Sequence, residues 1–179
     1  MRSLNEQNEV KRTAEVLERL AAGEDCALIS VAGTPKVSFP GTRLVTAVAD
    51  AGFRVVPIPG PSAVTAALSA SGLSAGRFLF LGFAPRKGKE RDQWMQQSLD
   101  SPNTVVVFEA PGRLETLLGG WVAAGAAERQ CVVCRVSTTL DLVVRRGTVG
   151  ARGEDNAGGR VRVVLRVGVE GRGRGWLGE

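Results

Sequence analysis

The spacing of apolar and polar residues along this chain predicts helices joined to short strands. Two helices are predicted near the start, Asn8–Ala22 and Thr42–Ala51, because apolar residues recur there every three or four positions. Each is followed by a short apolar run, Cys26–Ser30 and Arg54–Ile58, which we expect to form a buried strand. This order of elements is typical of a parallel, doubly wound sheet, and since a helix comes first we expect that sheet to be partial.

The same alternation continues and predicts a second α/β domain. Its expected elements are a helix at Ser62–Ser71, a strand at Arg77–Phe83, a polar helix at Arg91–Leu99, a strand at Thr104–Phe108, a helix at Leu114–Ala124, a strand at Gln130–Val136, a loop at Gly150–Gly159 and a strand at Arg160–Val167. We therefore expect an α/β fold, with a partial parallel doubly wound sheet in residues 1–58 and a second α/β domain in residues 59–168. Residues 169–179 form a Gly/Arg-rich tail.

Two turns of small residues follow the expected strands of the first domain. Ala32-Gly33-Thr34-Pro35 follows one strand and Gly60-Pro61-Ser62-Ala63 follows the other. Ligands of parallel α/β sheets bind beyond the carboxyl ends of the strands, where small residues let backbone N–H groups approach closely. We therefore expect a ligand site at these two turns.

Composition and charge restrict the class of protein and its expected location. It has 179 residues, a net charge of +5 and no apolar run near the roughly 20 residues that a membrane span needs. No hydrophobic signal region opens it, so we expect a protein that stays in the cytoplasm, or in an organelle if the source is eukaryotic. The late arginines, which include Arg145 and Arg146, are interpreted as a solvated basic end, with contact to RNA as the alternative.

The cysteines and the missing residue types exclude several kinds of chemistry. Cys131 and Cys134 stand three apart in an apolar run, where they face opposite sides of a strand, so we expect core cysteines and no metal site. With no His and no Tyr, triads that depend on histidine are excluded. No phosphate-binding loop of the G-x-x-x-x-G-K-[ST] type is present either.

Many stretches in order resemble the tetrapyrrole methylase superfamily of S-adenosylmethionine-dependent methyltransferases. They are Asn8-Glu9, Ala27-Leu28-Ile29-Ser30, Ala32-Gly33-Thr34-Pro35, Pro40-Gly41, Val55 through Ala63, Ala67 through Leu73, Gly82-Phe83-Ala84-Pro85-Arg86-Lys87, and Val107-Phe108-Glu109 with Pro111, Arg113 and Leu114. The resemblance spans about residues 8–118. Within the superfamily, the pattern is most similar to the branch that methylates the 2'-hydroxyl of a cytidine in small-subunit ribosomal RNA.

The resemblance implies two α/β domains, S-adenosylmethionine as cofactor, ribosomal RNA as partner and a homodimer. It places the methyl donor at Ala32, Gly33, Thr34, Pro35, Gly60, Pro61, Ser62, Ala63 and Phe108. It makes Glu109 the candidate catalytic residue, with a carboxylate at a helix start as the other interpretation. The RNA-binding candidates are Arg86, Lys87, Lys89, Arg91 and Arg113. Arg113 fits either a phosphate contact or an ion pair with Glu109 or Glu115.

The sequence also departs from the family pattern. The family's opening strand and glycine-bearing loop are expected before residue 8, and this sequence does not contain them. Charged positions of the family are occupied here by Val31, Phe39, Val136 and Thr139. We therefore expect weak cofactor binding and slow methylation, with exposed apolar side chains at Leu28, Val55 and Val56. The alternatives are a noncatalytic RNA-binding relative and a methyltransferase for a corrinoid or other tetrapyrrole.

Overall fold

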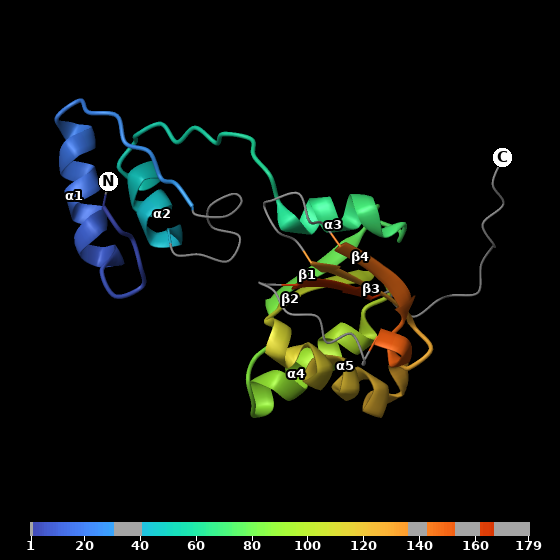
Figure 1. The fold of residues 1–179 in the computed structure, drawn as a ribbon. Coiled ribbons are helices and arrows are strands. Elements are labelled where there is room, and N and C mark those ends of the chain that lie inside the picture. The colour runs from blue at the N-terminus through green and yellow to red at the C-terminus, as the bar shows by residue number, and fades with distance from the viewer. Residues whose placement is uncertain (1, 31–40, 136–142, 153–161, 167–179) are drawn as a thin grey trace, which may run out of the picture. The chain divides into compact units, whose positions relative to one another are not determined.

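The computed structural model describes residues 2–30, 41–135, 143–152 and 162–166. The chain divides into two compact units, Met1–Ser62 and Ala63–Glu179 (Figure 1). Within the described residues, no helix is long and apolar enough to cross a membrane.

The first unit contains two helices packed against each other, α1 (Glu9–Ala21) and α2 (Thr42–Asp50). Both were predicted from the spacing of apolar residues, and both are confirmed. Leu44 and Val48 of α2 are buried. The Glu9 carboxylate accepts a hydrogen bond from the backbone N–H of Gly41 at 3.0 Å, which joins the start of α1 to the start of α2.

The two strands predicted in the first unit are wrong. Residues 24–30 and 53–62 run as irregular backbone, and Ile29 and Ile58 are 68% and 79% exposed. A parallel strand forms only when a neighbouring strand satisfies its backbone hydrogen bonds, and the described part of this unit contains no strand. The expected exposure of Val55 and Val56 is confirmed, whereas Leu28, for which exposure was also expected, is half-buried.

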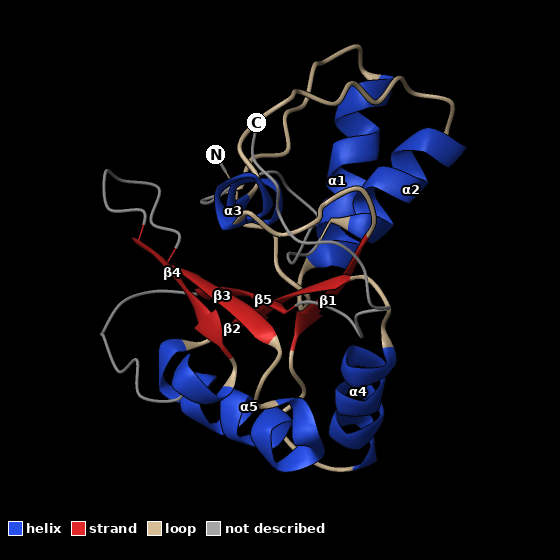
Figure 2. Cartoon of the chain, turned by 90° about the vertical axis from the view of Figure 1, so that its right-hand side faces the viewer, coloured by secondary structure: helices blue, strands red, loops and turns tan. Residues whose placement is uncertain are grey.

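The second unit is built on a five-stranded sheet with the order β1-β2-β5-β3-β4 (Figure 2). Its strands are β1 (Phe78–Phe83), β2 (Thr104–Glu109), β3 (Gln130–Arg135), β4 (Val143–Thr148) and β5 (Arg162–Arg166). The β1–β2 pair is parallel, whereas β5 runs antiparallel to β2 and β3, and β4 antiparallel to β3. The expected α/β class is confirmed, with a sheet that is mixed.

β4 was missed by the sequence analysis, which interpreted Arg145 and Arg146 as part of a basic solvated end. Both side chains are exposed, as expected, but they lie in an edge strand of the sheet and not in a tail. The guanidinium of Arg146 donates hydrogen bonds to the backbone carbonyls of Ala70 and Ser71. Those carbonyls lie in the last turn of a helix, where cations are favoured.

Helices cover both faces of this sheet (Figures 1 and 2). α3 (Ala63–Ser71) lies on one face, while α4 (Lys89–Asp100) and α5 (Leu114–Trp121) lie on the other. Each face of the sheet packs against its helices in a hydrophobic core, and β2 contributes side chains to both cores. Val105 and Val107 pack on the α4–α5 side, and Val106 and Phe108 pack on the α3 side, because successive side chains of a strand point to opposite faces. Each buried aliphatic side chain contributes roughly 1.5–3 kcal/mol.

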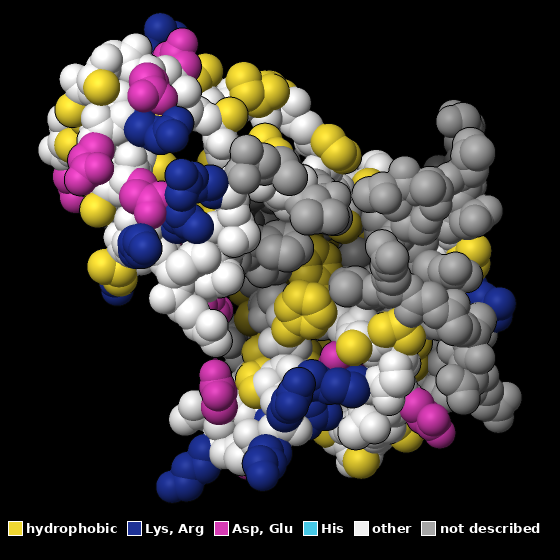
Figure 3. All heavy atoms as spheres, turned by 60° about the vertical axis from the view of Figure 1, so that its left-hand side comes forward, with side chains coloured by type: hydrophobic (Ala, Val, Ile, Leu, Met, Phe, Trp, Pro, Cys, Tyr) yellow, Lys and Arg dark blue, Asp and Glu magenta, His cyan; other side chains and the backbone are white. Residues whose placement is uncertain are grey.

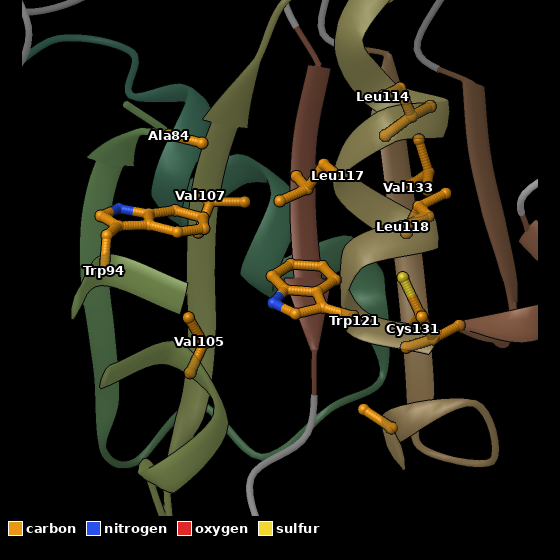
Figure 4. Packing of buried hydrophobic residues seen from close by; sticks show 12 residues of the cluster. Ala84, Trp94, Val105, Val107, Leu114, Leu117, Leu118, Trp121, Cys131 and Val133 are labelled. Atoms are coloured by element: carbon orange, nitrogen blue, oxygen red, sulfur yellow. The ribbon is translucent and has the colours of Figure 1, made fainter. Parts of the chain in front are cut away.

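The α4–α5 core contains two tryptophans with fixed ring positions (Figure 4). The rings of Trp94 and Trp121 are stacked with centroids 6.4 Å apart. Trp94 donates from its indole N–H to the Leu81 carbonyl, and Trp121 donates to the Ser98 hydroxyl at 2.8 Å. The helix that we predicted as polar therefore carries one buried aromatic residue into the core.

The prediction that Cys131 and Cys134 are core residues is confirmed. Cys131 and Cys134 are both fully buried, the first in the α4–α5 core and the second in the α3 core, on opposite faces of β3. Burial raises the pKa of the Cys134 thiol to about 11. Both cysteines are core residues, and the Cys134 thiol has little tendency to ionise.

Helix ends differ slightly from the predicted ones. α5 ends at Trp121, and a wider turn, Val122–Ala126, follows it, because Gly125 has a φ of 81° and cannot continue the helix. Short 3₁₀ turns lie at Pro111–Arg113, before α5, and at Gly150–Arg152, after β4.

Candidate functional site

The candidate site lies at one edge of the second unit's sheet. Because β1 and β2 are parallel, their carboxyl ends meet at the same edge, which is where α/β sheets hold ligands. The loop after β1 is Ala84–Gly88, and the 3₁₀ turn Pro111–Arg113 follows β2. All the predicted RNA-binding residues belong to these two connections or to the helix that follows the first one, and Glu109 is the last residue of β2.

Glu109 is fully buried at the end of β2. Its Oε1 accepts the backbone N–H of Ala110 at 2.9 Å, and its Oε2 lies 3.4 Å from the Arg113 Nη2. Oε2 has no hydrogen-bond partner among the described residues. Burial raises the pKa of this carboxyl, although the Ala110 N–H, Arg113 and Arg91 act in the opposite direction.

Arg113 makes the ion pair with Glu109 that was one of its two predicted roles. The same guanidinium also donates to the backbone carbonyls of Ala84 at 2.6 Å and Pro85 at 3.3 Å. Arg91, from the first turn of α4, donates to the Pro85 carbonyl at 2.9 Å. Two guanidiniums therefore fix the start of the loop that follows β1, and both are partly buried.

The remaining predicted RNA-binding cations are free of such bonds to the loop backbone. Arg86, Lys87 and Lys89 are exposed on the Ala84–Gly88 loop and the first residue of α4. Figure 3 shows Lys and Arg side chains gathered beside hydrophobic ones on the second unit. The five predicted cations thus divide into three that face solvent and two that hold the loop. Their role toward RNA stays a prediction.

A bulge near the end of β1 brings an aromatic ring to this edge. Phe80 pairs with Val106, but Phe83 pairs with Phe108, so three steps along β1 match two along β2. Gly82, inside the bulge, has a φ of 61°, which residues with a side chain rarely adopt. The bulge turns Phe83 toward the face on which Phe80 lies, and both rings contact Phe108, with centroids 5.5 Å and 4.9 Å away.

Sequence reasoning missed Phe83 as a site residue. It is 44% exposed although its ring packs against Phe108. A glycine inside an apolar strand, here Gly82, is the signal that could have found it, because such glycines mark bulges that redirect a neighbouring side chain.

The predicted cofactor residues are distributed between the two units. Ala63 is the first residue of α3, and it packs with Phe108 in the α3 core. Gly60, Pro61 and Ser62 lie at the end of the first unit, in irregular backbone. Ala32, Gly33, Thr34 and Pro35 lie outside the described residues. Phe108 and Glu109 point to opposite faces of the sheet, as neighbours in a strand must.

At this edge of the sheet, exposed cations that suit a polyanion lie next to a buried carboxyl group. Three exposed cations suit phosphate groups, and an exposed ring suits a flat heteroaromatic partner. Glu109 faces Ala110 and Arg113, which are the contacts of a structural carboxylate, and its catalytic role stays a prediction. Among the described residues, no group of three or more His, Cys, Asp or Glu side chains could hold a metal ion.

Comparison with known proteins shows the relatives of this chain. A protein named ribosomal RNA small subunit methyltransferase I, from Mycobacterium bovis, is 42% identical over 147 residues, which are 82% of this chain and 52% of that protein. The chain therefore spans about half the length of the curated relatives that it matches.

Solved structures share the fold. The methyltransferase CobJ superposes with a TM-score of 0.69 at 22% identity, over 93% of this chain and 74% of that one. Uroporphyrin-III C-methyltransferase from Thermus thermophilus, complexed with S-adenosylhomocysteine, gives a TM-score of 0.57 at 17% identity, over 88% and 73%. The family described as tetrapyrrole (corrin/porphyrin) methylases matches residues 1–151. The chain belongs to this tetrapyrrole methylase family.

Proposed function

We infer that this chain is part of an S-adenosylmethionine-dependent methyltransferase that modifies the 2'-hydroxyl of a cytidine in small-subunit ribosomal RNA. One observation carries the proposal: the 42% identity, over 82% of the chain, to a protein named as a small-subunit ribosomal RNA methyltransferase. The exposed cations Arg86, Lys87 and Lys89 support it, since an RNA substrate requires contacts to phosphate groups. Ribosomal RNA as substrate makes the cytoplasm the expected location.

The residues present fit a donor that carries an adenosine. Phe108 offers aromatic surface at the carboxyl end of β2, on the face that α3 covers. The donor-binding residues that we propose are Ala32, Gly33, Thr34 and Pro35, then Gly60, Pro61, Ser62 and Ala63, and Phe108. When bound, S-adenosylmethionine supplies a methyl group on a positively charged sulfur.

The contribution of the chain itself is to position the substrate and to handle one proton. Cations on the Ala84–Gly88 loop hold RNA phosphates, so that a ribose hydroxyl is presented in a fixed orientation. The hydroxyl loses its proton as its oxygen forms the new bond to the methyl carbon, while the bond between that carbon and the donor's sulfur would break and leave the neutral thioether. Glu109 is our candidate acceptor, because its raised pKa makes it a stronger base than an ordinary carboxylate.

Alkaline hydrolysis tests the proposed reaction directly. The chain is incubated with S-adenosylmethionine labelled in its methyl group and with unmodified small-subunit RNA. A 2'-O-methyl group blocks alkaline cleavage of the neighbouring phosphodiester, so we expect the label in alkali-resistant dinucleotides that contain cytidine. Label released on single nucleotides would contradict the proposal. Sedimentation of the same sample tests the homodimer that the family resemblance implies.

The loop cations give a matched test of the RNA interface. Replacing Arg86, Lys87 and Lys89 with Ala is expected to weaken RNA binding and to reduce the salt dependence of binding, by roughly 0.7 in log–log slope for each lost contact to single-stranded RNA. The control replaces Lys11, Arg43 and Arg54, which are exposed in the first unit and carry the same total charge. Equal losses in both triple variants would show a general charge effect and no defined interface.

A further inference from the structure

Phe83 occupies an unusual position for a phenylalanine of the sheet. It is 44% exposed at the carboxyl end of an edge strand, yet its ring is held against Phe108, which in turn contacts Phe80. The three rings meet edge to face, with interplanar angles of 60° and 69°. The exposed ring is therefore supported from behind by the buried Phe108, so that little side-chain freedom remains to be lost on binding.

The backbone is arranged to present this ring. Strict alternation along β1 would place Phe83 on the face opposite Phe80. Because of the bulge at Gly82, both rings lie on the same face and contact the same residue, Phe108. A bulge interrupts the regular hydrogen bonding between two strands. Bulges nevertheless recur next to functional sites, because they change the direction of one side chain. The positive φ of Gly82 identifies the residue that makes the bulge possible.

Cations follow the ring directly along the chain. The loop that begins at Ala84 carries Arg86 and Lys87, and Lys89 opens α4. Arg91 and Arg113 hold the Ala84 and Pro85 carbonyls, so the loop's start is fixed relative to the ring. An exposed aromatic ring beside a short run of cations is the combination that binds unpaired nucleic acid, through base stacking and phosphate contacts.

We propose that Phe83 is a base-stacking residue for an unpaired nucleotide of RNA, with Arg86, Lys87 and Lys89 holding the adjoining phosphates. The inference rests on the proposed function, because it takes its ligand, RNA, from there. Arg91 and Arg113 act as positioning residues in this site, since their guanidiniums are engaged by the loop backbone. The charge of the loop and the supported ring together favour a single strand over a duplex, whose bases are already stacked.

Fluorescence anisotropy with a labelled 12-residue oligocytidylate tests the inference in the full chain. Phe83→Ala is expected to weaken binding roughly five- to hundredfold, the range found for one stacked base. Phe83→Trp is expected to bind at least as tightly as the parent. Phe78→Ala is the matched control, because Phe78 lies at the other end of the same strand and is 41% exposed. We expect it to bind like the parent.

Two further measurements separate base stacking from a general loss of structure. The salt dependence of binding should be unchanged in Phe83→Ala, since no phosphate contact is lost, and binding of a blunt RNA duplex of equal length should change less than twofold. Equal affinity of Phe83→Ala and Phe78→Ala for the oligocytidylate would overturn the inference and leave the proposed function intact. Absence of RNA binding by the parent chain would overturn both.

Calorimetry with S-adenosylhomocysteine distinguishes the two possible sources of a stacked base. If Phe83→Ala loses affinity for this small molecule and keeps its affinity for RNA, the ring belongs to the donor's adenine, and the RNA assignment is wrong. Unchanged affinity for S-adenosylhomocysteine together with weakened oligocytidylate binding supports the assignment.

Discussion

Trp121→Ala is expected to lower the free energy of unfolding of the second unit by about 3–5 kcal/mol, the usual cost of removing a large buried aromatic side chain. Trp121 is fully buried, stacks on Trp94 and donates a hydrogen bond to Ser98. Its loss leaves a cavity between α5 and the sheet and removes one of the two hydrogen bonds of the Ser98 hydroxyl, which still donates to the Met95 carbonyl. Since a domain is typically stable by about 5–15 kcal/mol, this change removes a large part of the total.

Urea unfolding followed by circular dichroism measures this loss. Trp121→Phe keeps much of the ring volume but removes the indole N–H, so it should cost less than Trp121→Ala. The lost hydrogen bond to Ser98 should contribute roughly 0.5–1.5 kcal/mol, because the Ser98 hydroxyl keeps its bond to the Met95 carbonyl. Val122→Ala is the control, because Val122 is the next residue and is 40% exposed. A similar midpoint for Trp121→Ala and Val122→Ala would contradict the packing that the structure shows.

Arg113→Ala is expected to destabilise the same unit in a manner that depends on pH. The substitution leaves the Ala84 carbonyl without this donor and Glu109 without its nearby cation. Leaving a buried acceptor without a donor costs roughly 1–3 kcal/mol, and breaking a buried ion pair costs roughly 3–5 kcal/mol. At pH 7 we expect the free energy of unfolding to fall by an amount between these two. At acidic pH Glu109 is protonated in the folded chain, so the loss should be smaller.

The pH dependence has a definite sign. Burial raises the pKa of Glu109 in the folded chain above its unfolded value, so the folded state holds the proton more tightly. The contribution of this group to stability is therefore present below the unfolded pKa of about 4.3 and is lost as pH rises through the folded pKa. Removing Arg113 raises the folded pKa further and widens that window.

Glu109→Gln provides the matched variant for this prediction. It should flatten the dependence of stability on pH relative to the parent, with a difference no steeper than about 1.4 kcal/mol per pH unit, since one proton is involved. Combined with Arg113→Ala, it should recover the part of the loss that arises from the unpaired carboxylate. A loss for Arg113→Ala that is identical at pH 4 and pH 8, with or without Glu109→Gln, would show that the ion pair contributes nothing.

Much of the second unit could be predicted because its pattern is local. Thr104–Glu109 is a continuous apolar run followed by a carboxylate, and such runs become buried central strands. The segments Cys26–Ser30 and Arg54–Ile58 carry the same kind of pattern and form no strand. The difference lies in their surroundings, because a strand depends on partners that its own sequence does not specify.

Elements that depend on tertiary contacts could not be predicted from the pattern alone. β4 carries Arg145 and Arg146 at the edge of the sheet, where one side meets solvent, so it lacks the apolar signature of a strand. At the candidate site, the position of Glu109 at the end of β2 followed from the sequence. Its pairing with Arg113, four residues later, was one of two roles that the sequence offered for that arginine. The burial of Glu109 and the redirection of Phe83 could not be predicted, because each depends on residues from another strand or loop.

The placement of the three cysteines determines where the folded protein can be chemically labelled. Cys26 is exposed in the first unit, whereas Cys131 and Cys134 are buried in the second. With a pKa near 11, the Cys134 thiol is ionised in only about three molecules in ten thousand at pH 7.5, and thiol reagents attack the ionised form. A maleimide dye added to the folded chain is therefore expected to attach at Cys26. The first unit then carries a fluorophore, and the candidate site of the second unit stays unmodified.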